Sequence, residues 1–171
     1  MAPSIKVGDT IPKGEFGYIP YAPELEDNLA CGVPGKISTD DWKGKKVVLF
    51  SVPGAFTPTC HTNHLPPYLA KHAEFKAKGV DVIAVVAAND LFVMSGWARF
   101  EGCKDKILAL SDTYAKWSES LGLSVDLTER GLGLRTARYA MIIDDLVVKY
   151  IEVESAPGVS VSGAEAVLGK L

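Results

Sequence analysis

Short apolar runs bounded by turn-forming residues recur along the chain. Two of them, at 47–52 and 80–87, are rich in β-branched side chains and nearly free of polar residues. This pattern predicts strands that are buried on both faces of a sheet. Between them we expect a helix over 60–78, kinked where two consecutive prolines, Pro66 and Pro67, interrupt it.

The same patterns predict the later elements. Helices are expected at 91–100, 111–121 and 162–168, and further strands at 107–110, 138–143 and 146–153. A loop is expected at 124–134, and a tight turn at 144–145 joins the last two strands into a hairpin. Strands that alternate with helices and end in an antiparallel pair predict a mixed central sheet flanked by helices on both faces, an α/β fold.

Residues 1–45 are rich in proline and glycine and are expected to form a loop-rich N-terminal extension. Within it we expect a short edge strand at 16–20, a second short strand near 35–37 and one helical turn at 38–42. The chain shows no linker, repeat or low-complexity tract. Residues 1–171 are therefore predicted to form a single domain.

The net charge and the lengths of the apolar runs limit which kinds of partner are expected. A net charge of −3 gives no field that would attract nucleic acid or anionic lipid, so neither is expected as a partner. The longest apolar run is far shorter than the ~20 residues that span a bilayer, so no membrane segment is expected. The N-terminal residues also lack the basic and apolar pattern of a secretory signal.

Three cysteines, Cys31, Cys60 and Cys103, are an odd number with irregular spacing, which does not suggest a disulfide framework. A reducing compartment fits this usage best, and a cytoplasmic location is expected. The last three residues, Gly169-Lys170-Leu171, approach the Ser-Lys-Leu peroxisomal address without matching it. Import into peroxisomes therefore stays open as an alternative.

Cys60 is the candidate for a reactive cysteine thiolate. Thr57 is a favoured N-cap and Pro58 suits the first helical position, so Cys60 falls at the third. A thiol there lies among unpaired backbone N–H groups at the positive end of the helix dipole, which favours the thiolate. The Thr57 hydroxyl is expected either to cap the helix or to turn toward the sulfur. Chemistry at Cys60 also requires that the sulfur be within reach of water.

Other interpretations of these residues remain. A lone cysteine is more often a small buried hydrophobe. The histidines His61, His64 and His72 suggest a metal, but no further cysteine or carboxylate has ligand spacing, and no metal site is expected. Cys60 and His64 lie four residues apart on one helix face, so a Cys–His nucleophile for acyl transfer is a weaker alternative.

The segment VPGAFTPTC at 52–60, followed by His64-Leu65-Pro66, closely resembles the active-site signature of the peroxiredoxins. The chain is most similar to the type II (atypical) branch of plants, fungi and animals, which reduces alkyl hydroperoxides. The likeness continues through 78–82, 86–90 and 126–140 in the same order. It covers the chain from about residue 47 to the end and is weaker before.

The resemblance implies a thioredoxin-like fold and a thiol peroxidase that needs no cofactor and forms a homodimer beside the active-site loops. It implies that Cys60 is the peroxidatic cysteine, which attacks hydrogen peroxide or an alkyl hydroperoxide and becomes a sulfenic acid. It also implies that Thr57 binds the peroxide, that Pro53 shields the thiolate from water, and that Arg138 holds thiolate and peroxide together. His64 stands where the wider family often has a glutamate that braces this arginine, and a supporting role is expected for it.

The sequence departs from the family where relatives carry a second, resolving cysteine, since this chain has Val85, Ser160 and Ser162 at those places. We therefore expect one obligatory cysteine, recycled by thioredoxin or by glutathione and glutaredoxin. Cys31 is the alternative, as a resolving cysteine in an exposed turn, and Cys103 is expected at a helix end. A competing interpretation is a redox-sensing module on the same scaffold, which would be oxidised once without turnover.

Overall fold

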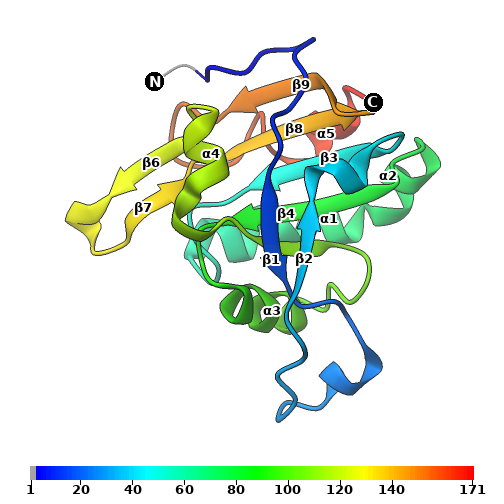
Figure 1. The fold of residues 1–171 in the computed structure, drawn as a ribbon, viewed down its shortest axis with the longest axis vertical. Helices are drawn as coiled ribbons and strands as arrows, with labels where there is room; N and C mark the ends of the chain where they lie inside the picture. Colours follow the sequence, from blue (N-terminus) through cyan, green and yellow to red (C-terminus); the bar gives the residue numbers. More distant parts are fainter. Residues whose placement is uncertain (1–2) are drawn as a thin grey trace.

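The computed structural model describes residues 3–171 (Figure 1). Its strands are β1 (Glu15–Tyr18), β2 (Gly35–Ser38), β3 (Lys46–Ser51), β4 (Val82–Ala87), β5 (Leu108–Ser111), β6 (Ser124–Leu127), β7 (Gly133–Thr136), β8 (Tyr139–Asp144) and β9 (Val147–Val153). Its α-helices are α1 (Leu65–Ala70), α2 (His72–Ala77), α3 (Leu91–Phe100), α4 (Lys116–Ser120) and α5 (Ala164–Leu168). Seven strands form one sheet in the order β2-β1-β5-β4-β3-β8-β9, and β6 and β7 form a separate hairpin.

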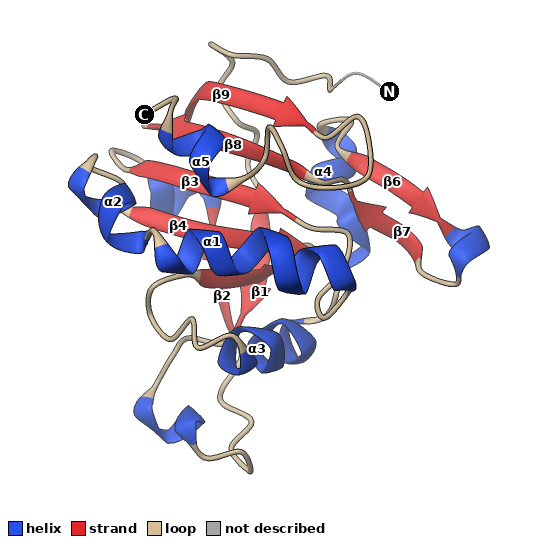
Figure 2. Ribbon diagram, turned by 180° about the vertical axis from the view of Figure 1, so that it is seen from behind, coloured by secondary structure: helices blue, strands red, loops and turns tan. Residues whose placement is uncertain are grey.

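The centre of the sheet is built as the sequence predicts. The strand β3 pairs in parallel with β4 and antiparallel with β8, so it is buried between two neighbours. Alternate side chains of β3 point to opposite faces: Val48 and Phe50 join one apolar core, and Val47 and Leu49 join the other. The helices α1, α2 and α5 cover the first face (Figure 2), and α4 covers the second. The predicted mixed α/β sheet with helices on both faces is confirmed.

The helix predicted over 60–78 is present but divided. Cys60–His64 form a π-helical turn, in which the N–H of Leu65 donates to the carbonyl of Cys60. The α-helix α1 follows, and the helical conformation is interrupted at Lys71 before α2 begins. Pro66 and Pro67 offer no N–H donors, so the regular ladder cannot continue through this turn. A π-helical turn is a common adjustment of this kind.

Two local predictions are wrong. The loop expected at 124–134 contains β6 and the first half of β7, because four-residue strands with a charged Asp126 lack the strong apolar pattern of a buried strand. The strand expected at the edge, β1, lies between β2 and β5. Pro20 lies beyond its end, so that proline does not restrict β1 to an edge.

Other elements differ less. The helix α3 has the predicted bounds, and the Asp90 side chain caps it by accepting from the N–H groups of Phe92 and Val93. The helix expected from residue 111 becomes regular only at Lys116, because Tyr114 and Ala115 adopt left-handed backbone conformations.

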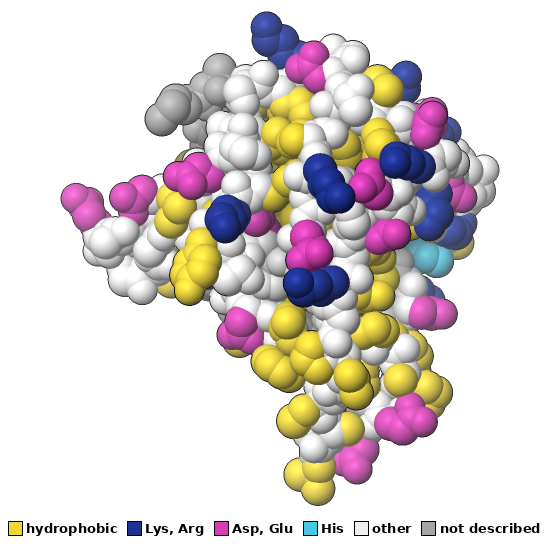
Figure 3. Space-filling view, in the orientation of Figure 1, with side chains coloured by type: hydrophobic (Ala, Val, Ile, Leu, Met, Phe, Trp, Pro, Cys, Tyr) yellow, Lys and Arg dark blue, Asp and Glu magenta, His cyan; other side chains and the backbone are white. Residues whose placement is uncertain are grey.

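The face shown in Figure 3 carries charges of both signs side by side. Hydrophobic side chains gather at its lower end, where the segment 19–34 projects from the sheet. Among residues 3–171, no helix is long and apolar enough to cross a membrane.

Candidate active site

Cys60 lies in the first helical turn after the loop that leaves β3. The carbonyl of Thr57 accepts the N–H of His61 at 2.9 Å, so Thr57 occupies the cap position of the backbone. Its hydroxyl, however, donates to the carbonyl of Gly54 at 2.8 Å. The expectation that this side chain either caps the helix or turns toward the sulfur is therefore wrong for this state, because the hydroxyl closes the preceding loop instead.

The guanidinium of Arg138 points at the sulfur. Arg138 directly precedes β8, and the pairing of Ser51 with Tyr139 carries it from far along the sequence to the end of β3. Its Nη2 atom donates to Sγ of Cys60 at 3.3 Å. A permanent cation and the start of a helix thus converge on one thiol, and both favour the thiolate.

Cys60 has no exposed surface. It packs in the core cluster on the helix-covered face of β3, which includes Val52, Ala55 and Leu65. The expectation of a sulfur within reach of water is wrong for this state of the molecule. The helical turn directs the side chain inward toward the sheet, and the loop 53–57 lies next to it in the chain.

His64 connects Arg138 to the C-terminal segment. Its Nδ1 atom lies 3.0 Å from Nη1 of Arg138, and its Nε2 atom lies 2.9 Å from the carbonyl oxygen of Ser162. An arginine can only donate and a carbonyl can only accept, so Nε2 carries the proton and Nδ1 accepts. Burial, together with the charge of Arg138, lowers the pKa of His64 to about 4, although the bond to Ser162 opposes this. His64 is therefore neutral at physiological pH.

Two further polar side chains hold the loop before Cys60, and sequence reasoning did not assign them a role. Nη1 of Arg135 donates to the carbonyl of Pro53 at 3.1 Å and lies 3.4 Å from Oδ1 of Asn89. The same Oδ1 accepts the N–H of Ala55 at 2.9 Å. Asn89 and Arg135 both stand within the segments that resemble the peroxiredoxins, which was the only signal that could have found them. Pro53, with its ring partly exposed, thus begins a loop that is fixed through its backbone.

The other two cysteines are placed differently from Cys60. Cys31 is exposed in the segment 19–34, which Arg99 of α3 holds by donating to the carbonyls of Asp27 and Ala30, each at 2.7 Å. Cys103 is buried just after α3. Burial, with a contribution from the charge of Glu101, raises the pKa of the Cys103 thiol to about 12. All three cysteines are free thiols.

His61 is turned away from this chemistry. Its Nδ1 atom accepts the N–H of Trp97 Nε1 at 3.1 Å, which fixes the ring against α3, and a carboxylate oxygen of Glu101 lies 2.5 Å from the same atom. The described part of the chain, residues 3–171, contains no group of three or more histidine, cysteine or acidic side chains arranged to hold a metal ion.

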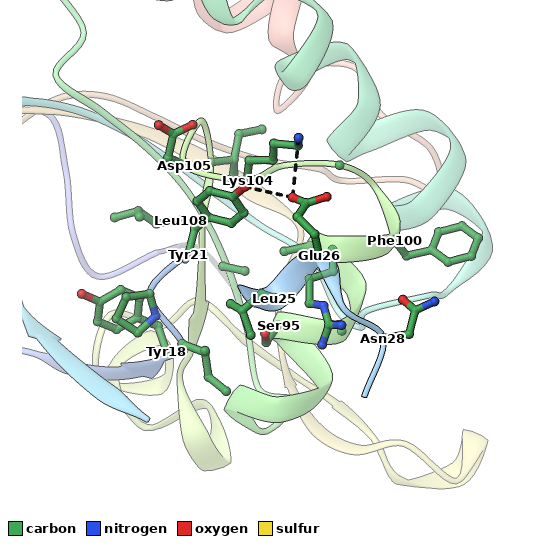
Figure 4. Close-up of a pocket in the computed structure, with 18 residues that line it drawn as sticks. Tyr18, Tyr21, Leu25, Glu26, Asn28, Ser95, Phe100, Lys104, Asp105 and Leu108 are labelled. Atoms are coloured by element: carbon green, nitrogen blue, oxygen red, sulfur yellow. Dashed lines mark hydrogen bonds and ion pairs between the residues drawn. The ribbon is translucent and has the colours of Figure 1, made fainter. Parts of the chain in front are cut away.

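A separate cavity of about 540 Å³ lies between the segment 19–34 and α3 (Figure 4). Tyr18, Leu25 and Leu108 contribute to its apolar walls. Two of its charged side chains, Glu26 and Lys104, pair with each other, and Glu26 also accepts from the hydroxyl of Tyr21. None of its lining residues belongs to the site around Cys60.

Comparison with known proteins agrees with this geometry. The family model described as Redoxin matches residues 6–168. The chain is 40% identical over 171 residues to Peroxiredoxin-2C of Oryza sativa subsp. japonica, with all of both chains covered. It is 45% identical over 159 residues to a protein of Lipomyces kononenkoae named as a peroxisomal peroxiredoxin, covering 92% of this chain and 95% of the relative.

Among solved structures, the chain is similar to reduced Prx3 of Vibrio vulnificus in complex with hydrogen peroxide. The TM-score is 0.83 with 41% identity, covering 96% of this chain and 98% of the other. The similarity confirms the thioredoxin-like fold expected from the sequence. Since both the family model and these relatives cover nearly the whole chain, the protein belongs to the peroxiredoxins, in the type II branch of the Redoxin family, and is a thiol peroxidase.

Proposed function

We propose that Cys60 is the peroxidatic cysteine and that Arg138 activates it. The observation that carries this proposal is the 3.3 Å contact between Nη2 of Arg138 and Sγ of Cys60 in the first turn of a helix. A thiolate is the reactive form of cysteine, and an arginine stays charged at every physiological pH. Among residues 3–171, neither of the other two cysteines accepts a hydrogen bond from a guanidinium.

The reaction follows from these groups. The thiolate sulfur attacks one oxygen of the hydroperoxide, so an S–O bond forms while the O–O bond breaks. Cysteine becomes a sulfenic acid, and the other oxygen leaves as an alkoxide or hydroxide that takes up a proton to give an alcohol or water. Arg138 offers N–H donors to the developing negative charge. The Thr57 hydroxyl would bind the peroxide after exchanging its bond to Gly54.

Access to the sulfur requires motion of the loop 53–57, because Cys60 is fully buried. Phe56 in this loop has a left-handed backbone conformation and a half-exposed ring, both of which ease its departure. We assign to Pro53 the role of limiting water at the sulfur when the loop is closed. Hydrogen peroxide is the small substrate suggested by the ligand of the Vibrio vulnificus structure.

We propose that an external thiol, from thioredoxin or from glutathione and glutaredoxin, reduces the sulfenic acid. Cys103 is a poor resolving cysteine, since its buried thiol has a pKa of about 12. Cys31 is exposed and remains the alternative. Steady-state peroxide consumption by the Cys31→Ser protein decides between them. Turnover should persist with one of the two reducing systems, and loss of turnover with both would assign resolution to Cys31.

We propose a homodimer that forms beside the active-site loops. Phe56 and Phe100 are exposed, and their rings lie 5.9 Å apart edge to face. Phe92 and Leu29 are also exposed apolar side chains, and surface aromatics of this kind are typical of interfaces. Sedimentation of the wild-type protein and of Phe100→Glu should give a dimer and a monomer, respectively. A wild-type monomer at micromolar concentration would contradict the proposal.

We also propose that residues 1–171 act as one domain and that the protein works in the cytoplasm, with import into peroxisomes as the alternative. The name of the Lipomyces kononenkoae relative supports the alternative. Fluorescence microscopy of the chain with an N-terminal fluorescent tag, with and without Gly169-Lys170-Leu171, separates the two locations.

A further inference from the structure

Glu154, directly after β9, organises the C-terminal segment that contacts His64. We propose that Glu154 is a positioning residue, which holds the Arg138 guanidinium against the Cys60 sulfur without touching either group. This inference rests on the proposed roles of Cys60 and Arg138. It is carried by a continuous chain of hydrogen bonds from the Glu154 carboxylate to Sγ.

The first step is the carboxylate itself. Its Oε1 atom accepts the N–H of Ser160 at 2.7 Å, and the N–H and the hydroxyl of Ser162 at 2.8 Å each. Its Oε2 atom accepts the hydroxyl of Ser160 at 2.6 Å. Four donors from two residues fold the segment 160–162 around one side chain. Although burial alone would raise the pKa of Glu154, these bonds lower it, so the carboxylate is ionised at neutral pH.

The second step is the carbonyl of Ser162, which the folded segment directs into the core. This oxygen accepts the hydroxyl of Tyr68 at 2.6 Å and lies 2.9 Å from Nε2 of His64. Because a carbonyl can only accept, it requires the proton of His64 to be on Nε2. The lone pair of Nδ1 is then left to face Nη1 of Arg138.

The third step holds the backbone of Arg138, at the opposite end of the residue from the guanidinium. The backbone N–H of Glu154 donates to the carbonyl of Arg138 at 2.9 Å. The same residue thus holds the main chain of Arg138 directly and its guanidinium through Ser162 and His64. The described residues place no carboxylate within ion-pair distance of Arg138, so its charge is not neutralised by a close partner. A positioned but unneutralised cation stabilises a thiolate better than one paired with a carboxylate.

The test uses a Cys31→Ser background, so that Cys60 is the only cysteine that reacts readily. Two quantities are measured: the rate constant for oxidation by hydrogen peroxide in a single turnover, and the pH midpoint of Cys60 alkylation. Glu154→Ala should slow oxidation at least about tenfold and raise the alkylation midpoint, because a misplaced guanidinium no longer supports the thiolate. Glu152→Ala, at an exposed position of β9, should leave both quantities unchanged.

Glu154→Gln is the conservative variant, which should keep most of the oxidation rate that Glu154→Ala loses. Its amide oxygen can replace Oε1 and keep three of the four bonds, while the Ser160 hydroxyl can accept from the amide nitrogen. It should retain a rate within about threefold of the parent. Equal losses in Glu154→Gln and Glu154→Ala would overturn positioning, since they would assign the effect to the charge alone.

If Glu154→Ala does not fold, the double variant Ser160→Ala/Ser162→Ala decides, because it removes only two hydroxyl donors. It should shift both quantities in the same direction by a smaller amount. A folded variant of either kind with the parental rate and midpoint would overturn the inference. That result leaves the proposed function standing if the parent is still oxidised at Cys60 and Arg138→Ala is slow. A parent that is not oxidised at Cys60 would overturn both.

Discussion

Cys60 and Cys103 are both fully buried, and yet their surroundings are opposite. Cys60 opens a helical turn and receives a hydrogen bond from a guanidinium. Cys103 follows a helix and has the Glu101 carboxylate nearby, so burial and charge both raise its pKa. Burial and a nearby carboxylate thus keep the Cys103 thiol protonated, whereas a guanidinium and a helix start, the groups that stabilise a thiolate, lie at Cys60. The two sites form an internal control for the peroxidase chemistry.

Replacement of each cysteine by serine should reveal the difference between Cys60 and Cys103 most strongly. Cys60→Ser should abolish peroxide consumption, because a serine hydroxyl cannot replace a thiolate in this reaction. Cys103→Ser should retain the first rapid oxidation, because its thiol stays protonated at neutral pH. Both are measured by stopped-flow mixing with hydrogen peroxide, with Cys31→Ser as a further control. Normal kinetics in Cys60→Ser would refute the assignment.

Removal of the cation should make Cys60 more like Cys103. We expect Arg138→Ala to slow oxidation about 10²- to 10³-fold and to raise the pH midpoint of Cys60 alkylation. Arg138→Lys keeps the charge but not the planar fork, so its midpoint should shift less while its rate remains reduced. An unchanged alkylation midpoint in Arg138→Ala would count against electrostatic activation.

The site around Cys60 includes the buried His64, and this histidine should make the stability of the folded protein sensitive to acid. Its pKa is about 4 in the folded protein and about 6.5 when unfolded, so the unfolded state takes up more protons as the pH falls. Its contribution to stability is complete above pH 6.5 and is lost as the pH falls toward 4. The loss should amount to about 3 kcal/mol of unfolding free energy.

Urea denaturation at pH 7 and pH 4 measures this loss. The pH dependence should be smaller by that amount in His64→Asn, which has no titrating ring, and largely retained in His72→Asn, whose ring is much less buried. Identical pH dependence in the wild-type and His64→Asn proteins would contradict a buried neutral histidine.

The smallest effect is expected at Cys103. Glu101→Gln removes the nearby charge but not the burial, which is the larger cause of the raised pKa. Alkylation of Cys103 at pH 8 should therefore change by less than about threefold. Mass spectrometry of the alkylated peptide, with the exposed Glu119→Gln as control, measures it. A large gain in reactivity would show that charge, and not burial, silences this thiol.

The sequence predicted most of the fold because its central elements have strong local patterns. The apolar runs of β3 and β4 are continuous, and Asp90 marks the start of α3 at the observed residue. The β6–β7 hairpin was missed because its short strands alternate weakly. The prolines predicted an interruption of the long helix, but not that a π-helical turn would place Cys60 facing the core.

The candidate site was only partly predictable for a different reason. The motif around Cys60 is local, but Arg138 lies 78 residues away and Ser162 lies 98 residues from His64. The contact of Arg138 with Cys60 depends on the pairing of β3 with β8, which no local pattern encodes. The assignment of Arg138 came from resemblance, and the structure distinguishes it from the nearby Arg135, because Arg135 holds the loop backbone at Pro53 and Arg138 faces the sulfur. The complete burial of the sulfur was not foreseen.

Intact mass after one equivalent of hydrogen peroxide, followed by peptide mapping, tests the central claim most directly. A single added oxygen on the peptide that contains Cys60, with Cys103 unmodified, is the predicted result. A loss of two hydrogens within one chain, or a cross-linked dimer, would instead show that Cys31 has resolved the sulfenic acid. An unmodified Cys60 peptide, with the oxygen elsewhere or peroxide unconsumed, would contradict the account.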